Sequence, residues 1–142
     1  MKDLPRGVRN RNPGNLRKGD DWRGLSEDQT DKDFCIFTAP LWGIRALVRV
    51  LLNYQRKRQL HTIRQIINRW APPNENDTGA YVDAVTKHVH VIADSPVNLE
   101  DRVTMFLLVE AIIQHENGIQ PYGGDIIHAA LTAAGINGKA TS

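Results

Sequence analysis

The residues from Leu99 to Gly118, LEDRVTMFLLVEAIIQHENG, form the most apolar long segment of the chain. Its spacing predicts a helix that is apolar on nearly every side, and such a helix is normally buried with other helices packed around it. The segment is too short and too interrupted by charge to cross a membrane. Acidic residues at its start suit the helix dipole, and Gly118 supplies a left-handed stop. We therefore expect a mainly α-helical domain built around this central buried helix.

Glu116 lies in the last turn of the predicted helix, where the dipole does not favour a negative charge. Partial burial would further favour its protonated form. A carboxyl group that keeps its proton near neutral pH can serve as a general acid. The alternative is a surface glutamate that pairs with an arginine. Glu110, in the middle of the same segment, is predicted to be structural, buried and paired with an arginine from the first 50 residues.

Length and composition predict a single domain over residues 1–142. The one cysteine, Cys35, excludes an internal disulfide and a thiolate-rich metal site. His115 and Glu116 are not followed by the second histidine of an HExxH motif, so no metal and no organic cofactor are predicted. Residues 1–20 lack the apolar core of a signal peptide, so we expect synthesis in the host cytoplasm. The net charge of +2 weakly favours an anionic partner.

Helical periodicity predicts five to six helices and at most a small β element. Thr62 is a predicted N-cap, and a basic turn is expected at residues 55–61. Residues 1–33 are predicted to be loops, with a turn at Asn12-Pro13-Gly14-Asn15 in which Gly14 takes a positive φ. We expect the last residues, 137–142, to fray. The predicted helices span 41–54, 63–70, 78–88, 99–118 and 123–135, with an extended piece at 34–38.

The first part of the chain is rich in basic residues, namely Arg6, Arg9, Arg11, Arg17, Lys18 and Arg23. These cations could hold phosphates, line a groove for an anionic glycan, or pair with nearby carboxylates in a solvated loop. Nucleic-acid binders usually place stacking aromatic residues among such cations. Only Trp22 is available here and no recognition helix is predicted, so nucleic-acid binding is the weaker reading.

Five motifs together resemble a family of small phage proteins that are variously described as virion proteins, endolysins or lytic enzymes. The resemblance covers residues 6–122. The motifs are RGVRNRNPGNLR at 6–17, WRGL at 22–25, DFCIFTAPLWGIRAL at 33–47, WAPPNENDTGAYVDAV at 70–85 and IIQHENG at 112–118.

A more distant resemblance is to the flagellar-type peptidoglycan glucosaminidases of the lysozyme superfamily. Asn15-Leu16, Trp22-Arg23-Gly24, Phe34-Cys35-Ile36-Phe37 and Thr78-Gly79-Ala80-Tyr81 follow the order of motifs in that family. The helix that carries the acid comes last instead of first, as a circular permutation would produce. The resemblance implies a single lysozyme-like domain with Glu116 as general acid. It also implies that Tyr81 orients water or stabilises positive charge, although a core tyrosine with a satisfied hydroxyl is an equal alternative.

The function expected from these resemblances is a phage endolysin-type peptidoglycan glycosidase, either a muramidase or a lytic transglycosylase. It would act as a monomer on glycan strands in the periplasm, without nucleic acid or membrane insertion. One alternative is a non-enzymatic phage virion or cell-wall-binding structural protein; a nucleic-acid-binding helical protein is the less favoured one. Predicted substrate-binding residues are Asn12, Asn15, Arg17, Trp22, Asn74 and Asn76. Candidates for a second carboxylate are Asp20, Asp21, Glu75 and Asp77.

Overall fold

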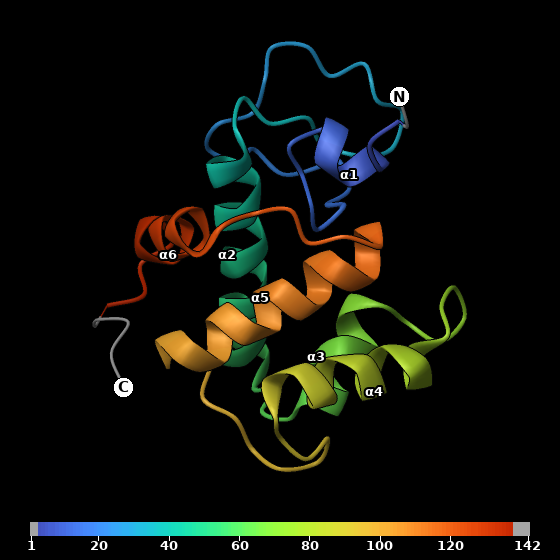
Figure 1. Cartoon of the computed structure of the whole chain (residues 1–142), viewed down its shortest axis with the longest axis vertical. Coiled ribbons are helices and arrows are strands. Elements are labelled where there is room, and N and C mark those ends of the chain that lie inside the picture. The colour runs from blue at the N-terminus through green and yellow to red at the C-terminus, as the bar shows by residue number, and fades with distance from the viewer. Residues whose placement is uncertain (1–2, 138–142) are drawn as a thin grey trace.

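Six helices and long connecting loops make up residues 3–137, the part of the chain that this computed structural model describes (Figure 1). The predicted mainly α-helical single domain is confirmed. Pairing between extended segments is limited, within those residues, to isolated bridges such as Arg17 with Phe34 and Leu25 with Phe37, so the piece at 34–38 is not a strand. The helices are α1 (Arg6–Arg9), α2 (Pro40–Arg58), α3 (Ile63–Trp70), α4 (Thr78–Val89), α5 (Arg102–Asn117) and α6 (Gly124–Ala133).

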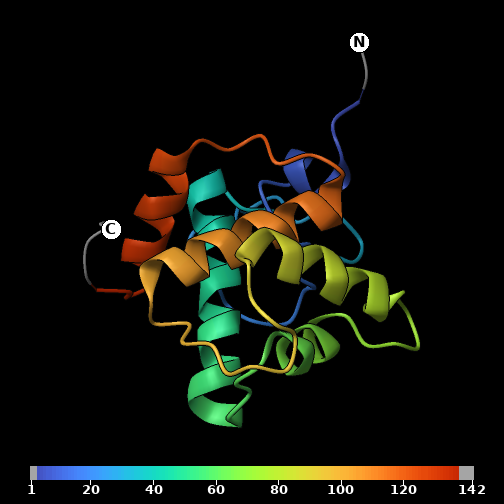
Figure 2. The same ribbon diagram turned by 60° about the horizontal axis from the view of Figure 1, so that its bottom comes forward.

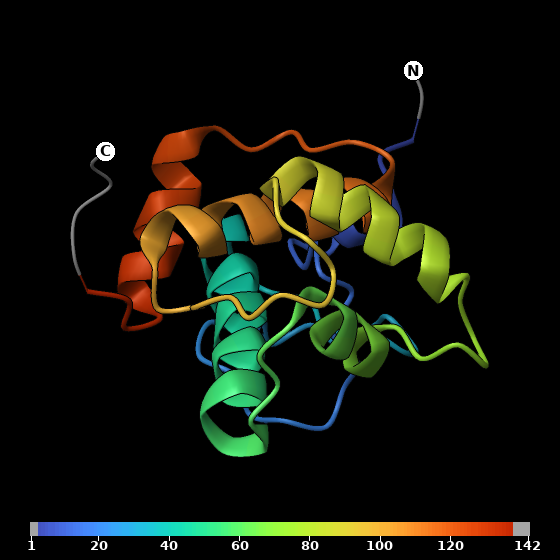
Figure 3. The same cartoon turned by 90° about the horizontal axis from the view of Figure 1, so that it is seen from below.

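Helices α2 and α5 supply the centre of the hydrophobic core. In the main hydrophobic cluster, five apolar residues of α2 and five of α5 are fully buried. Figure 2 shows α4 lying along α5, and Figure 3 shows α6 beside α2. The predicted buried helix is therefore present as α5, but it is not covered on every side, because Val103 near its start is 48% exposed. The buried residues are Ile44, Leu47, Val48, Leu51 and Leu52 of α2, and Met105, Leu108, Val109, Ile112 and Ile113 of α5.

Helix α2 is longer than the sequence predicts, because the basic residues expected to form a turn continue it to Arg58. Three cations occupy its last turn, where positive charge suits the negative end of the helix dipole. Arg56 also pairs with Glu100 at 2.6 Å. The helix stops at Gln59, which takes a left-handed φ of 57°. The predicted cap at Thr62 is confirmed: Thr62 and Gln65 form a capping box at the start of α3.

The N-terminal loop contains a short helix, α1, that the sequence did not predict. The turn at residues 12–15 is confirmed, since the Asn15 N–H donates to the Asn12 carbonyl at 2.9 Å. Its left-handed residue is Asn15, with φ of 52°, and not Gly14 as predicted. Gly14 instead packs closely on the core, since a Cβ there would lie 3.2 Å from a methyl group of Leu47. The expectation of fraying falls mainly on residues 138–142, which lie outside the described residues.

Candidate functional site

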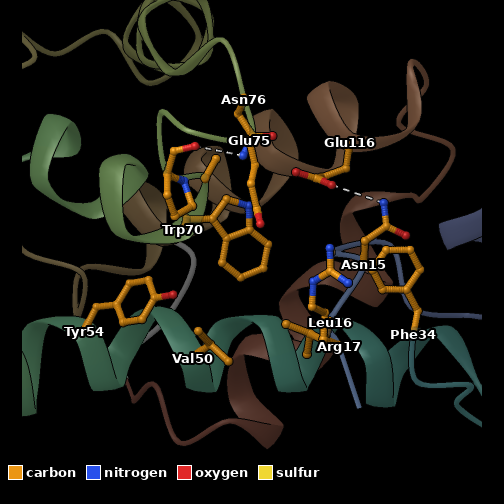
Figure 4. Close-up of a pocket in the computed structure, with 13 residues that line it drawn as sticks. Asn15, Leu16, Arg17, Phe34, Val50, Tyr54, Trp70, Glu75, Asn76 and Glu116 are labelled. Atoms are coloured by element: carbon orange, nitrogen blue, oxygen red, sulfur yellow. Dashed lines mark hydrogen bonds between the residues drawn. The ribbon is translucent and has the colours of Figure 1, made fainter. Parts of the chain in front are cut away.

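An open cleft of about 430 Å³ lies between the N-terminal loop and the loop that follows α3 (Figure 4). Figure 4 shows Asn15, Arg17 and Phe34 on one side of the cleft, and Trp70, Glu75 and Asn76 on the other. The cleft combines aromatic side chains with amides, carboxylates and one guanidinium group. Its lining residues are Gly14, Asn15, Leu16, Arg17, Phe34, Val50, Tyr54, Trp70, Ala71, Pro72, Glu75, Asn76 and Glu116.

Glu116 is half-buried on the wall of this cleft, and both oxygens of its carboxyl group accept hydrogen bonds. Asn15 Nδ2 donates to Oε1 at 3.1 Å, and the Tyr81 hydroxyl donates to Oε2 at 2.9 Å. The last turn of α5 presents the carboxyl group, and the helix stops at Gly118, where φ is 75°. Two donors from distant segments therefore hold the group in one orientation at the cleft surface.

Tyr81 lies behind the cleft wall and not on it. Its side chain is 2% exposed, and its hydroxyl accepts a hydrogen bond from Trp70 Nε1 at 3.0 Å while donating to Glu116. Its ring stacks on His115 with centroids 3.8 Å apart. Burial raises the pKa of Tyr81, and the Glu116 carboxylate raises it further, so the phenol keeps its proton. The tyrosine therefore positions Glu116 from behind.

The turn at residues 12–15 is attached to the end of α5 by a second amide. Asn117 Nδ2 donates to the carbonyl oxygens of Pro13 at 2.8 Å and Ile113 at 3.0 Å. Gly7 of α1 packs against the same place, because a Cβ there would lie 2.6 Å from Asn117 Oδ1 and 2.8 Å from Asn15 Oδ1. The close approach of α1 therefore requires glycine at this position.

Three of the six predicted substrate-binding residues line the cleft. Asn15 reaches Glu116, Arg17 lies over the Phe34 ring with its guanidinium carbon 5.2 Å from the ring centroid, and Asn76 donates to the Pro72 carbonyl at 3.2 Å. Arg17 and Asn76 are exposed at the surface of the cleft, so their side chains are accessible to a ligand.

The structure does not bring the other three into the cleft. Asn12 is fully buried, and its side chain donates to the carbonyl oxygens of Leu16 and Cys35 at 3.0 Å, so it shapes the loop. Trp22 packs against a small hydrophobic cluster that contains Cys35. Asn74 is exposed and does not line the cleft.

Among the four candidate second carboxylates, Glu75 lines the cleft with Glu116. Asp77 caps α4 by accepting from the Ala80 N–H at 3.2 Å. Asp20 and Asp21 line hollows on other parts of the surface. Only one of the four candidates therefore shares the cleft with Glu116, and nothing local in the sequence distinguishes Glu75 from the other three.

The aromatic residues of the cleft were missed by sequence reasoning. The sequence predicts Tyr54 and Trp70 only as the last residues of the helices at 41–54 and 63–70. Both are half-buried, with part of the ring on the core and part facing the cleft. A signal for Trp70 was present, since the Ala71-Pro72-Pro73 stop puts it at a helix end, where a large ring is seldom covered on all sides.

Glu110 has a structural role, but its predicted arginine partner is wrong. Its carboxylate lies 3.1 Å from His88 Nε2 and accepts from Gln120 Nε2 at 3.0 Å. Residues 3–137 contain no group of three or more histidine, cysteine, aspartate or glutamate side chains placed to hold a metal ion. None of the helices described combines the length and apolarity that crossing a bilayer requires.

Comparison with known proteins finds a phage relative. No family model matches the chain. The chain is similar to Protein P5 of Pseudoalteromonas phage PM2, with 38% identity over 131 residues that cover 89% of this chain and 80% of the relative. The similarity therefore extends over most of the chain.

This relative corrects the expected function. A phage protein that is known by a number fits a virion component better than an endolysin, so the endolysin-type glycosidase reading is wrong and the structural alternative is better supported. The relative's name says nothing about catalysis, so enzymatic activity on peptidoglycan stays a prediction, as does the lysozyme-superfamily resemblance.

Proposed function

This chain belongs to the same family of bacteriophage proteins as Protein P5 of phage PM2, and from that premise we propose that it is a structural virion protein that binds peptidoglycan glycan strands. The binding site is the cleft beside Glu116. The protein would act as a monomer on the cell wall in the periplasm, carried there by the phage particle.

The binding proposal rests on one observation: aromatic rings, amides and carboxylates line the same open cleft. Trp70 and Tyr54 offer ring faces on which the apolar side of a sugar can pack. Asn76 and Glu75 supply donors and acceptors for hydroxyl and acetamido groups. A few polar groups placed among apolar walls are typical of sites that bind and orient a neutral, hydroxyl-rich ligand.

One cation, Arg17, stands in the cleft beside the two carboxyl groups of Glu75 and Glu116, and it can pair with a carboxylate substituent of a wall polymer. Arg17 is exposed at the cleft and forms no ion pair with any residue in the described part of the chain. Its guanidinium group is free to bind a carboxylate through two parallel hydrogen bonds. The net positive charge of the chain favours approach to an anionic envelope.

Pelleting with purified, insoluble peptidoglycan tests the binding proposal. The cleft variant carries Arg17→Ala, Glu75→Ala and Asn76→Ala, which are three exposed positions that leave the core intact. The matched control carries Arg58→Ala, Glu27→Ala and Asn74→Ala, which are exposed and lie outside the cleft. We expect the cleft variant to bind about tenfold or more weakly, since each lost hydrogen bond contributes about 1 kcal/mol.

Failure of the wild-type protein to pellet with peptidoglycan, or equal pelleting of the two triple variants, would overturn the binding proposal. The same samples, assayed for released reducing and anhydro sugar ends, separately test the prediction of enzymatic activity. Wild-type and Glu116→Gln proteins that release no sugar ends would remove that prediction and leave binding untouched.

The virion assignment has its own test. Particles of the encoding phage, purified on a density gradient, should contain the chain when analysed by mass spectrometry. Its presence in the lysate together with its absence from washed particles would contradict a structural role.

A further inference from the structure

A hollow of about 520 Å³ on another part of the surface is lined by three arginines. Arg45 and Arg49 lie one turn apart on α2, and Arg23 comes from the N-terminal loop beside Trp22. Asp21 completes the lining. We call this hollow the arginine pocket. It shares no lining residue with the cleft beside Glu116, so its chemistry is separate from the proposed function.

Two of the three guanidinium groups are held in place by the end of α6. Arg45 Nε donates to the Ala133 carbonyl at 3.2 Å, and Arg49 Nη1 donates to the Ala134 carbonyl at 3.1 Å. A guanidinium group has five N–H donors, so each arginine keeps others for a ligand. These bonds fix the positions of the groups in advance and lower the cost of ordering them on binding.

The positive charge of the pocket is only partly balanced, by Asp21, within the part of the chain described. Arg6, Arg56 and Arg64 each pair with a carboxylate, but Arg23, Arg45 and Arg49 form no ion pair with any residue in the range 3–137. Partial burial lowers the pKa of Arg45, and the nearby charges of Arg23 and Arg49 lower it further. Like charges that crowd together in this way are stabilised when an anion binds between them.

We propose that the arginine pocket binds a phosphate group. With one aspartate against three arginines, the pocket has an excess of two positive charges, which matches a doubly charged phosphate better than a single carboxylate. The planar guanidinium fork binds phosphate oxygens through paired hydrogen bonds. Trp22 adds an apolar wall beside the site, against which the group that carries the phosphate can pack.

Titration with inorganic phosphate and with pyrophosphate, followed by NMR of the Trp22 indole and the arginine side chains, tests the site. Arg23→Gln is the informative variant, because Arg23 is exposed and makes no hydrogen bond to the described residues, so its loss should not affect folding. Arg58→Gln, at the exposed end of α2, removes the same charge elsewhere. We expect Arg23→Gln to weaken phosphate binding about tenfold and Arg58→Gln to change it less than about twofold.

A second experiment, with vesicles of phosphatidylcholine that contain phosphatidylglycerol, distinguishes a lipid phosphate from a soluble one. Co-sedimentation that Arg23→Gln abolishes assigns the pocket to a lipid headgroup. Saturable phosphate binding without co-sedimentation assigns it to a soluble phosphate or phosphate ester. The proposal is overturned if neither probe binds saturably, or if the Arg23→Gln and Arg58→Gln variants bind equally.

Binding to peptidoglycan shows whether the phosphate proposal and the wall-binding proposal fail independently. Arg23→Gln should pellet with peptidoglycan as the wild-type protein does, because the pocket and the cleft have no lining residue in common. Loss of phosphate binding with wall binding intact would therefore report on the arginine pocket alone.

Discussion

The Tyr81 hydroxyl donates a hydrogen bond to Glu116 Oε2 across 2.9 Å, and this contact joins α4 to the last turn of α5. The same hydroxyl accepts from Trp70 Nε1, at the end of α3. The Tyr81 hydroxyl thus connects three helices. It also links two residues that line the cleft, Trp70 and Glu116. The orientation of Glu116 depends on a buried residue that a ligand in the cleft would not touch.

Tyr81→Phe removes this hydroxyl and leaves both Trp70 Nε1 and Glu116 Oε2 without their partner. We expect the free energy of unfolding to fall by about 1–3 kcal/mol, because unmet polar groups are left in a largely buried place. Binding to peptidoglycan should weaken severalfold as Glu116 loses its fixed orientation. Urea unfolding and the pelleting assay measure the two effects.

Tyr122→Phe is the matched control for that substitution. The Tyr122 hydroxyl is buried and has no hydrogen-bond partner among the described residues, so its removal takes away a desolvated group without breaking a bond. Its stability should be equal to that of the wild-type protein or higher. A loss as large as that of Tyr81→Phe would show that the hydroxyl contact with Glu116 is not what stabilises the fold.

Alkaline pH should destabilise the protein through its buried tyrosines. Burial raises the pKa of Tyr81, Tyr54 and Tyr122 above that of about 10 in the unfolded chain. A folded-state pKa above the unfolded value means that stability is intact below pH of about 10 and falls as pH rises past it. Urea unfolding between pH of about 9 and 11 should show this decline, with a smaller slope for Tyr81→Phe. Identical slopes would contradict the assignment to Tyr81.

Acid pH should weaken the attachment of α1 to the loop at residues 31–33. Arg6 Nε donates to Asp31 Oδ2 at 2.7 Å, and Asn10 Nδ2 donates to the same oxygen at 2.8 Å. The hydrogen bond from Arg6 holds the pKa of Asp31 well below its usual range. A lowered folded-state pKa means that the stabilisation is present above pH of about 4 and is lost as pH falls below it. Asp31→Asn should therefore be less stable than wild type at pH of about 7, and the difference should shrink toward pH of about 2.

Gly7→Ala, in α1, should disturb the cleft by displacing the amide side chains of Asn15 and Asn117. The new Cβ would lie 2.6 Å from Asn117 Oδ1 and 2.8 Å from Asn15 Oδ1, so both amides must move, including the one that donates to Glu116. We expect a loss of about 1–3 kcal/mol in stability and weaker binding to peptidoglycan.

The control for that substitution is Gly79→Ala in α4, where the nearest atom to a Cβ is Asp77 Oδ1 at 3.9 Å. Alanine in a helix with open space around it should raise stability by about 0.5–1 kcal/mol. Urea unfolding compares the two. A Gly7→Ala protein as stable as wild type would mean that α1 can shift without consequence.

The features that sequence alone determined are those decided by neighbours within a few residues. The apolar run of α5, its stop at Gly118 and the N-cap at Thr62 all involve groups less than two helical turns apart. Their energies depend on local backbone geometry and side-chain spacing, so the pattern of residues was enough to predict them.

The features that only the tertiary structure decided are those that join distant segments. Asn15 and Glu116 are 101 residues apart, and the hydrogen bond between them exists because the packing of α1 and α5 brings the loop to the helix end. Asn12 and Asn15 lie in the same turn, yet one is fully buried and the other faces the cleft. Which amide meets a ligand depends on how the loop is rotated against the core, and that rotation is set by contacts that no short stretch of sequence contains.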